Sequence, residues 1–307
     1  MDTVLITGGT GLVGRALTTL LLERGYNVII LTRRPRASSH PQLRFAQWDL
    51  DRKTLDPTAL QEADHIVHLA GANVADKRWT AQRKQEILDS RVQSARLLYE
   101  RLADTSNNIK KVISASATGY YGPFKGDIFR EDAPPADDFL GVTCEAWENS
   151  VRKMEDLGKK VIILRTGLVL SLEGGALKEF SKPLKLGFAT VMGDGEQWVS
   201  WIHLHDLVRL YFNAIVNDRL QGVYNAVSPS PVTNEELVLA LARAAKGNSF
   251  VSVHIPAFAL KLALGEMSVE VLKSVKVSAD KIRETGFLFS YPEVAGAMEQ
   301  LLLTKKK

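Results

Sequence analysis

The chain has 307 residues, 45% hydrophobic and 24% charged, with a net charge of +4, which is typical of a soluble globular protein of one large or two closely joined domains. Lysine and arginine cluster only at 33–36 and 305–307, without interleaved aromatics, and no apolar run reaches the roughly 20 residues of a membrane span, so neither nucleic acid nor membrane is expected as a partner. The single cysteine, Cys144, excludes an internal disulfide and is typical of the reducing cytoplasm, where we expect the protein.

Residues 4–14 form a short apolar run, three spaced glycines and the start of a helical pattern. Gly8 permits a sharp turn out of a strand, Gly11 lets a pyrophosphate approach the backbone, and Gly14 lets the helix pack close to the strand. The first amides of the helix would face the anion. The pattern predicts a dinucleotide site whose binding residues are Gly8, Thr10, Gly11, Leu12 and Val13.

Apolar runs and helical patterns alternate through the first 170 residues. Strands are expected at 4–7, 28–31, 43–48, 66–69, 112–114 and 161–164. Apolar side chains recur at spacings of three and four within 13–21, 88–102 and 140–154, which predicts helices. The alternation predicts an α/β fold, a Rossmann-type doubly wound parallel sheet with helices on both faces.

The pattern changes after about residue 170, where glycine, lysine and aromatic residues dominate up to residue 200. We expect residues 1–170 to form an NADP-binding Rossmann domain, with 200–228 returning to it. Residues 171–199 and 229–307 are expected to form a smaller C-terminal substrate-side region. Because no flexible linker separates the two, the crevice between them is the expected ligand site.

The end of the second expected strand indicates which dinucleotide binds. NAD-binding folds place an acidic residue about 20 residues beyond the glycines to hold the ribose 2′-hydroxyl. This chain has Arg33 and Arg34 there and no acid. A guanidinium binds a 2′-phosphate that a carboxylate would repel, so NADP(H) is predicted; the alternative is that one of the arginines only decorates a surface turn.

Later motifs resemble the extended short-chain dehydrogenase/reductase group over nearly the whole chain. They are Asp49–Leu50, His68–Gly71, Ser114–Gly122, Leu164–Val169, Trp201–Leu207 and Gly222–Asn225. The resemblance implies that Asp49 and Leu50 contact adenine, and that the segments after the fourth, fifth and sixth strands pass the cofactor. The further cofactor residues it implies are Leu69, Ala70, Gly71, Ser114, Ala115, Thr166 and Gly167.

A narrower resemblance is to the atypical "epimerase family" branch, also named short-chain dehydrogenase family 39U. The segments that carry it are Arg78–Trp79, Ala146–Glu148, Gly174–Ala176, Trp198–His203 and Thr285–Pro292. The resemblance implies an NADP-binding fold whose substrates are poorly defined.

The usual catalytic pair of this group is a tyrosine and a lysine four residues apart on one helix face, where the ammonium lowers the pKa of the phenol. Aligning the helix on Glu148 places Leu140 and Cys144 at these positions, so the pair is missing. Tyr121 and Lys125 have the right spacing, but Gly122 and Pro123 between them exclude a helix.

Replacement groups are expected nearby. Ser116 keeps the serine position under one placement of an extra residue before Tyr121, and Tyr120 could supply a phenol from the loop; packing roles are the alternative for both. Trp79, Trp198 and Trp201 are expected to line the substrate pocket or, alternatively, to fill the core. No metal site is expected: His203 and His205 are interpreted as structural, and Asp206 as a helix cap.

These features predict an NADP(H)-dependent oxidoreductase that transfers hydride to or from a small carbonyl or alcohol. The first alternative is a non-catalytic NADP(H)-binding module that signals redox state, which the missing Tyr–Lys pair favours. The second is a nucleotide-sugar epimerase, which would need the missing tyrosine. The expected partner is a small-molecule substrate, and the protein is expected to be a monomer or homodimer.

Overall fold

The computed structural model describes residues 2–34 and 36–304. Residue 35, inside the first basic cluster, and the second basic cluster at 305–307 lie outside the described residues. Within the described part, no helix has both the length and the apolar character needed to cross a membrane.

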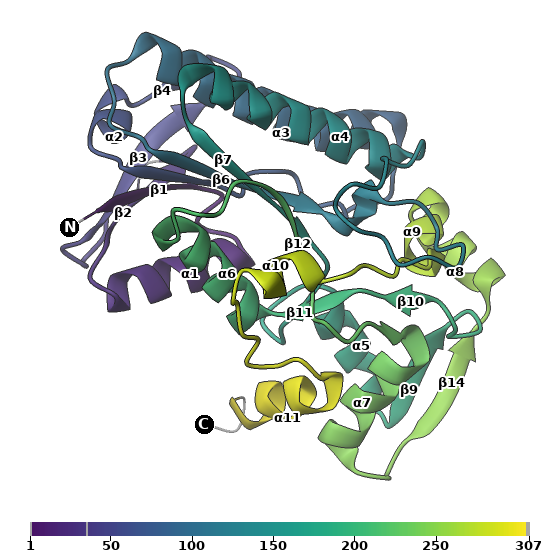
Figure 1. Ribbon diagram of the computed structural model, residues 1–307. Helices are drawn as coiled ribbons and strands as arrows, with labels where there is room; N and C mark the ends of the chain where they lie inside the picture. The colour runs from purple at the N-terminus through teal and green to yellow at the C-terminus, as the bar shows by residue number, and fades with distance from the viewer. Residues whose placement is uncertain (1, 35, 305–307) are drawn as a thin grey trace.

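A twisted eight-stranded sheet forms the centre of the molecule (Figure 1). Its strands, in spatial order, are β12 (Gly222–Ala226), β7 (Lys160–Thr166), β6 (Lys111–Ala117), β5 (His65–His68), β1 (Thr3–Thr7), β2 (Asn27–Thr32), β3 (Leu43–Asp49) and β4 (Thr54–Leu55). All neighbours pair in parallel except β3 and β4, which are antiparallel. Their apolar runs are continuous because both faces of the sheet are buried.

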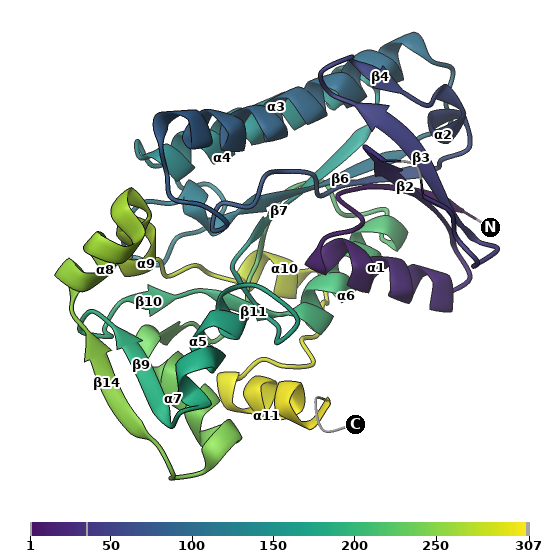
Figure 2. The same ribbon diagram turned by 180° about the vertical axis from the view of Figure 1, so that it is seen from behind.

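Helices cover both faces of this sheet, as Figures 1 and 2 show from opposite sides. On one face lie α1 (Leu12–Glu23) and α6 (Leu204–Val216); on the other lie α3 (Ala81–Asp104) and α4 (Phe139–Arg152), with the short α2 (Pro57–Gln61) near the β4 edge. Each face has its own hydrophobic cluster. The prediction of a doubly wound, Rossmann-type α/β fold is confirmed.

The second half of the chain builds smaller units beside the carboxyl ends of the strands. Three two-stranded pairs form: β8 (Leu168–Leu170) with β11 (Trp201–His203), β9 (Phe188–Met192) with β14 (Val251–Ile255), and β10 (Trp198–Val199) with β13 (Val232–Thr233). The helices are α5 (Ala176–Leu184), α7 (Asn234–Lys246), α8 (Ala257–Leu264), α9 (Ser268–Leu272), α10 (Asp280–Glu284) and α11 (Val294–Thr304). A third hydrophobic cluster joins α5, α7 and α11 to these strands, with the exception of β14.

Some element boundaries differ from the prediction. The fourth expected strand ends at His68 rather than at residue 69, because the amide of Leu69 already turns toward Thr7. The helix expected over 140–154 ends at Arg152 and continues as a 3-10 turn, η2 (Lys153–Leu157), which Gly158 closes in the left-handed conformation. Two further 3-10 turns, η1 (Thr118–Tyr120) and η3 (Gly265–Met267), flank the region described below.

Candidate functional site

The strand order reverses direction between β1 and β5, the place where open α/β sheets bind ligands. At the carboxyl ends of these strands, the Thr7 hydroxyl oxygen accepts hydrogen bonds from the amides of Leu69 and Ala70, both at 3.1 Å. Its distance to Nδ1 of His68 is 2.8 Å. The two crossover loops are therefore fixed to each other at the switch point.

The glycine turn after β1 is packed too tightly for side chains at two positions. Gly8 has φ +66°, and a Cβ there would lie 2.7 Å from the carbonyl oxygen of Leu69. A Cβ on Gly14 would lie 2.5 Å from the carbonyl oxygen of Gly8. At Gly11 the nearest atom, the same carbonyl oxygen, would be 3.2 Å away, which is a milder contact than at the other two glycines.

Helix α1 begins directly on this turn. Its N-cap is Gly11, which has no side chain to satisfy the first amides, so the amides of the first helical turn remain available to an anion. The loop after β8 lies beside this end of the helix: Gly174 is close to Leu12, and Glu173 lies 3.9 Å from Arg15. The sequence analysis did not assign this loop to the cofactor site, since its only local signal was a pair of glycines.

Arg33 and Arg34 are exposed directly after β2. The pKa of Glu86, in the second turn of α3, is lowered chiefly by its hydrogen bond from Arg83, with smaller contributions from Lys77 and Arg33. Arg33 therefore acts electrostatically on the start of α3.

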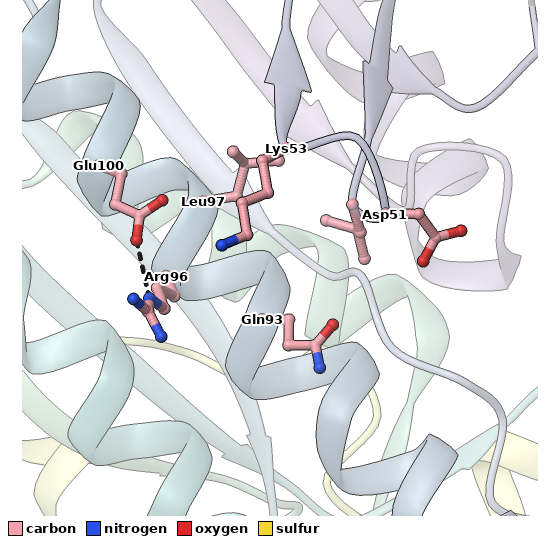
Figure 3. Close-up of a pocket in the computed structure, with 7 residues that line it drawn as sticks. Asp51, Lys53, Gln93, Arg96, Leu97 and Glu100 are labelled. Atoms are coloured by element: carbon pink, nitrogen blue, oxygen red, sulfur yellow. Dashed lines mark hydrogen bonds and ion pairs between the residues drawn. The ribbon is translucent and has the colours of Figure 1, made fainter.

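Asp49 is the last residue of β3, and Leu50 follows it. The Asp49 carboxylate accepts hydrogen bonds from the amides of Asp51 and Arg52, at 2.9 and 3.0 Å, so it holds its own turn. Leu50 borders a hollow of about 370 Å³ between this turn and α3 (Figure 3). Its other lining residues are Asp51, Lys53, Gln93, Arg96, Leu97 and Glu100. Because two cations and two carboxylates line it, the hollow has no net preference for an anion.

Ser116 belongs to a buried polar network. Its hydroxyl donates to Oε1 of Glu148 at 2.7 Å, and the Arg165 guanidinium donates to both carboxylate oxygens of Glu148, at 2.8 and 2.9 Å. All three side chains are at most 3% exposed. The bidentate pair raises the pKa of Arg165, against the opposing effect of its burial. As it lies, Ser116 faces α4 rather than open solvent.

Two adjacent tyrosines have different environments. Tyr121 is fully buried, accepts a hydrogen bond from Arg165 at 2.9 Å and donates to Asn225 at 2.7 Å; burial raises its pKa to about 12. Tyr120 is partly exposed, and the Arg165 guanidinium carbon lies 3.4 Å from the centre of its ring. Burial also raises the pKa of Tyr120, while Arg165 lowers it.

Leu140 and Cys144 occupy the helix face where the usual pair would lie. A Cβ on Gly119 would be 3.2 Å from Leu140, so Leu140 packs against the turn that follows β6. Cys144 is 4% exposed, and burial raises the pKa of its thiol to about 12, which makes it a poor nucleophile. Thr118, which the sequence analysis did not single out, is partly exposed at the end of β6; its side chain has no hydrogen-bond partner among the described residues.

The remaining predicted cofactor residues lie at the carboxyl ends of the central strands. Gly71 contacts Arg91, and Ser114 is buried and donates to the carbonyl of Ala115. Thr166 ends β7, and a Cβ on Gly167 would lie 2.4 Å from the carbonyl oxygen of Ser200. The structure therefore brings these positions to the same edge of the sheet as the glycine turn.

The three tryptophans that were expected to line the substrate pocket lie in different environments. Trp201 is fully buried and donates to the carbonyl of Ser230, which is core packing. Trp79 is 9% exposed, donates to the carbonyl of Val74 and packs edge-on against Phe139. Trp198 is partly exposed, and the ammonium of Lys276 lies over its ring.

The interpretation of Asp206 as a helix cap is wrong. The N-cap of α6 is His203, whose Nδ1 accepts from the amide of His205, and Asp206 lies within the first turn. Its buried carboxylate accepts hydrogen bonds from the amides of Ser290 and Tyr291, both at 2.8 Å. Among residues 2–34 and 36–304, no group of three or more His, Cys, Asp or Glu side chains could hold a metal ion.

Two family models match the chain. Residues 4–226 match the NAD dependent epimerase/dehydratase family, and residues 255–301 match a domain of unknown function, DUF1731. The second match covers the segment from β14 to α11.

Known proteins resemble the chain over its full length. Epimerase family protein SSP1921 of Staphylococcus saprophyticus is 35% identical, covering 98% of this chain and 100% of the relative. The crystal structure of the human epimerase family protein SDR39U1, with NADPH, superposes with a TM-score of 0.87 at 29% identity, covering 97% and 98% of the two chains. MoeE5 in complex with UDP-glucuronic acid and NAD gives a TM-score of 0.79 at 25% identity, covering 100% and 99%. The predicted resemblance to the epimerase-family branch is confirmed.

Proposed function

This chain belongs to the NAD dependent epimerase/dehydratase family, and from that premise we propose that it is an NADP(H)-dependent oxidoreductase acting on a small carbonyl or alcohol. The observation that carries the proposal is the glycine turn at the switch point, with two exposed arginines at the end of β2 where NAD-binding folds place an acid. The NADPH in the structure of human SDR39U1 supports the same cofactor.

The residues that would hold the cofactor surround the switch point. The amides at the start of α1, beside Gly11, would bind the pyrophosphate, and Arg33 and Arg34 the 2′-phosphate. Leu50 would bound the adenine, and Thr166 and Gly167 would lie along the nicotinamide. NADPH supplies a hydride when bound.

Tyr120 is the proposed proton donor. Burial raises its pKa, so the phenol stays protonated at neutral pH and can protonate a carbonyl oxygen during reduction. Arg165, stacked on the ring and fixed by Glu148, holds the phenol in place and favours the phenolate that forms. Ser116 contributes by orienting Glu148 and, through it, Arg165.

A non-catalytic NADP(H)-binding module is the second candidate, because Leu140 and Cys144 replace the usual pair with apolar, buried groups. A nucleotide-sugar epimerase is less favoured, since Leu140 stands where that reaction needs a tyrosine. Both alternatives share the cofactor site and differ only in the chemistry.

Calorimetric titration of the purified protein with NADPH and NADH tests the cofactor. We expect NADPH to bind more tightly, and Arg33→Ala or Arg34→Ala to weaken NADPH about tenfold or more while changing NADH little, since each charged hydrogen bond contributes about 1.5–3 kcal/mol. Equal affinities for the two nucleotides would overturn the NADP(H) assignment.

A screen of carbonyl compounds for NADPH consumption then tests turnover. We expect a turned-over substrate, and Tyr120→Phe to lower kcat while leaving NADPH binding unchanged. A protein that binds NADPH but consumes none with any compound would support the binding module instead.

A further inference from the structure

Lys276 lies in a segment that is fixed on both sides. The amide of Val275 donates to the carbonyl of Trp198 at 2.9 Å, on the β10 side. On the other side, the amide of Phe124 donates to the carbonyl of Ser274 at 2.7 Å, and the amide of Phe129 to that of Lys276 at 2.9 Å. Residues 274–276, the lysine segment, are therefore held between β10 and the loop that follows η1 (Figure 1).

The ammonium of Lys276 is held by aromatic rings instead of a carboxylate. Its Nζ lies 3.5 Å from the ring centre of Trp198 and 5.8 Å from that of Phe124. Three residues earlier, Lys273 pairs with Asp138 at 2.5 Å and Glu270 at 3.7 Å. Among the described residues, Lys276 has no such counter-ion, although its side chain is partly buried.

The indole of Trp198 provides a second unused donor. The indoles of Trp79 and Trp201 donate to backbone carbonyls, whereas that of Trp198 has no acceptor among residues 2–34 and 36–304 and is not fully buried. A lysine ammonium carries three donors and no acceptor, and an indole carries one donor. The pair thus presents fixed positive charge and N–H groups without any acceptor of their own.

The lysine segment lies near the proposed proton donor. Phe124, which flanks Lys276, is four residues from Tyr120, so their Cα atoms are at most roughly 14 Å apart. Phe129, whose amide donates to the carbonyl of Lys276, stacks its ring on Tyr121 with centroids 5.2 Å apart. Tyr120 and Lys276 therefore belong to neighbouring segments joined through Phe124 and Phe129.

We propose that the substrate carries an anionic group, a carboxylate or a phosphate, which Lys276 and the indole of Trp198 bind. The inference rests on the proposed function, because it names the substrate class of that same site. The aromatic rings attract the Lys276 ammonium without taking up all of its N–H groups, so these groups can still donate to an anion. Because the side chain is already held in place, it loses little conformational freedom when the anion binds. Neutral carbonyl compounds would leave the charge unpaired and bind poorly.

The test follows the indole N–H signal of Trp198 by NMR in the full-length, ¹⁵N-labelled protein saturated with NADP⁺, or without nucleotide if none binds. Trp198→Phe assigns the signal. Inorganic phosphate and acetate are titrated separately, with ionic strength held constant by sodium chloride. We expect one of the two anions to shift the signal, which identifies the group as phosphate or carboxylate.

Variants decide whether the lysine is responsible. Lys276→Gln should weaken the shift about tenfold or more, and Lys276→Arg should retain it. Lys246→Gln, an equal loss of charge at an exposed residue of α7, should leave it unchanged. No shift with either anion, or an unchanged titration in Lys276→Gln, would overturn the inference. Calorimetry with NADPH separates the two proposals: NADPH binding should be the same in Lys276→Gln, and its absence in the unmodified protein would refute only the proposed function.

Discussion

At the scale of single residues, hydrogen bonds determine which tautomer His68 adopts. The Thr7 oxygen accepts from the amides of Leu69 and Ala70, so its own proton is directed to Nδ1 of His68. Nε2 then carries the ring proton and donates to the hydroxyl of Ser94 at 3.3 Å. The neutral ring satisfies every partner, and burial, assisted by the Arg91 charge, lowers its pKa to about 3.

Stability should therefore fall in mild acid. The unfolded chain takes up a proton at His68 below its ordinary pKa of about 6.5, whereas the folded protein does so only near pH 3. Between pH 6.5 and 5 this difference removes about 1.6 kcal/mol from the free energy of unfolding. Urea unfolding at both pH values should show a smaller decrease for His68→Gln than for the unmodified protein; equal decreases would contradict the assignment.

The Glu148–Arg165 pair makes a prediction about stability. Removing one partner of a buried ion pair leaves an uncompensated charge and costs about 3–5 kcal/mol. Glu148→Gln should therefore lower the free energy of unfolding by this amount, and the double variant Glu148→Leu with Arg165→Met should recover most of it. Arg152→Ala removes a partly exposed cation 3.7 Å from the same carboxylate and should cost under about 1 kcal/mol. A small effect of Glu148→Gln would show that water reaches the pair.

At the scale of elements, two glycines where the turn meets α1 are expected to affect different properties: Gly14 the stability of the fold, and Gly11 the binding of the cofactor. A Cβ at Gly14 would meet the backbone of Gly8 and Gly9 at 2.5–2.8 Å, so Gly14→Ala should push the helix from the strand and cost at least about 1–3 kcal/mol. At Gly11, which has φ −76°, a Cβ would lie 3.2 Å from the carbonyl oxygen of Gly8, a tight contact but a milder one than those at Gly14. Gly11→Ala should therefore lower the unfolding free energy less than Gly14→Ala but weaken NADPH binding about tenfold or more. Calorimetry with urea unfolding tests both; unchanged binding in Gly11→Ala would place the cofactor elsewhere.

An element or contact can be predicted from the sequence when the interactions that produce it lie within a short stretch of the chain. The run at 28–31 predicts a strand because both faces of that strand are buried, and the pattern needs no distant partner. By contrast, β14 (Val251–Ile255) has four exposed residues in a row and pairs only with β9, so its sequence carries little periodic signal. Asp206 binds amides 84 and 85 residues away, and no local pattern distinguishes that role from a helix cap.

The candidate site shows the same limit. Its glycine turn is one continuous segment, and the sequence predicted it with its context. The partner of Ser116 is Glu148, which a different element brings to the end of β6. Lys276 lies in the region matched by the domain of unknown function, and only the fold places it against Trp198.

At the scale of the whole molecule, hydrogen bonds from one arginine join α8 to the loop that follows β5. Leu260 is the one buried residue of α8, whereas Phe258 and Leu262 are 75% and 79% exposed. The Arg78 guanidinium, from the loop after β5, donates to the carbonyls of Leu262 and Ala263 at the carboxyl end of the helix. These groups would otherwise lack partners, and the cation also interacts favourably with that end of the helix dipole.

Arg78→Ala should therefore loosen α8 without unfolding the protein. Regions with few buried apolar contacts open with low free energy, so we expect hydrogen exchange over residues 257–272 to rise about tenfold or more, while amides of the central strands stay protected. Lys84→Ala, which removes a partly exposed ion pair with Glu266 at 2.6 Å and an ammonium 5.7 Å from the ring centre of Phe139, should raise exchange much less. If exchange in α8 is the same in Arg78→Ala as in the unmodified protein, the helix is held by its own packing, and the loop after β5 does not couple the sheet to the C-terminal region.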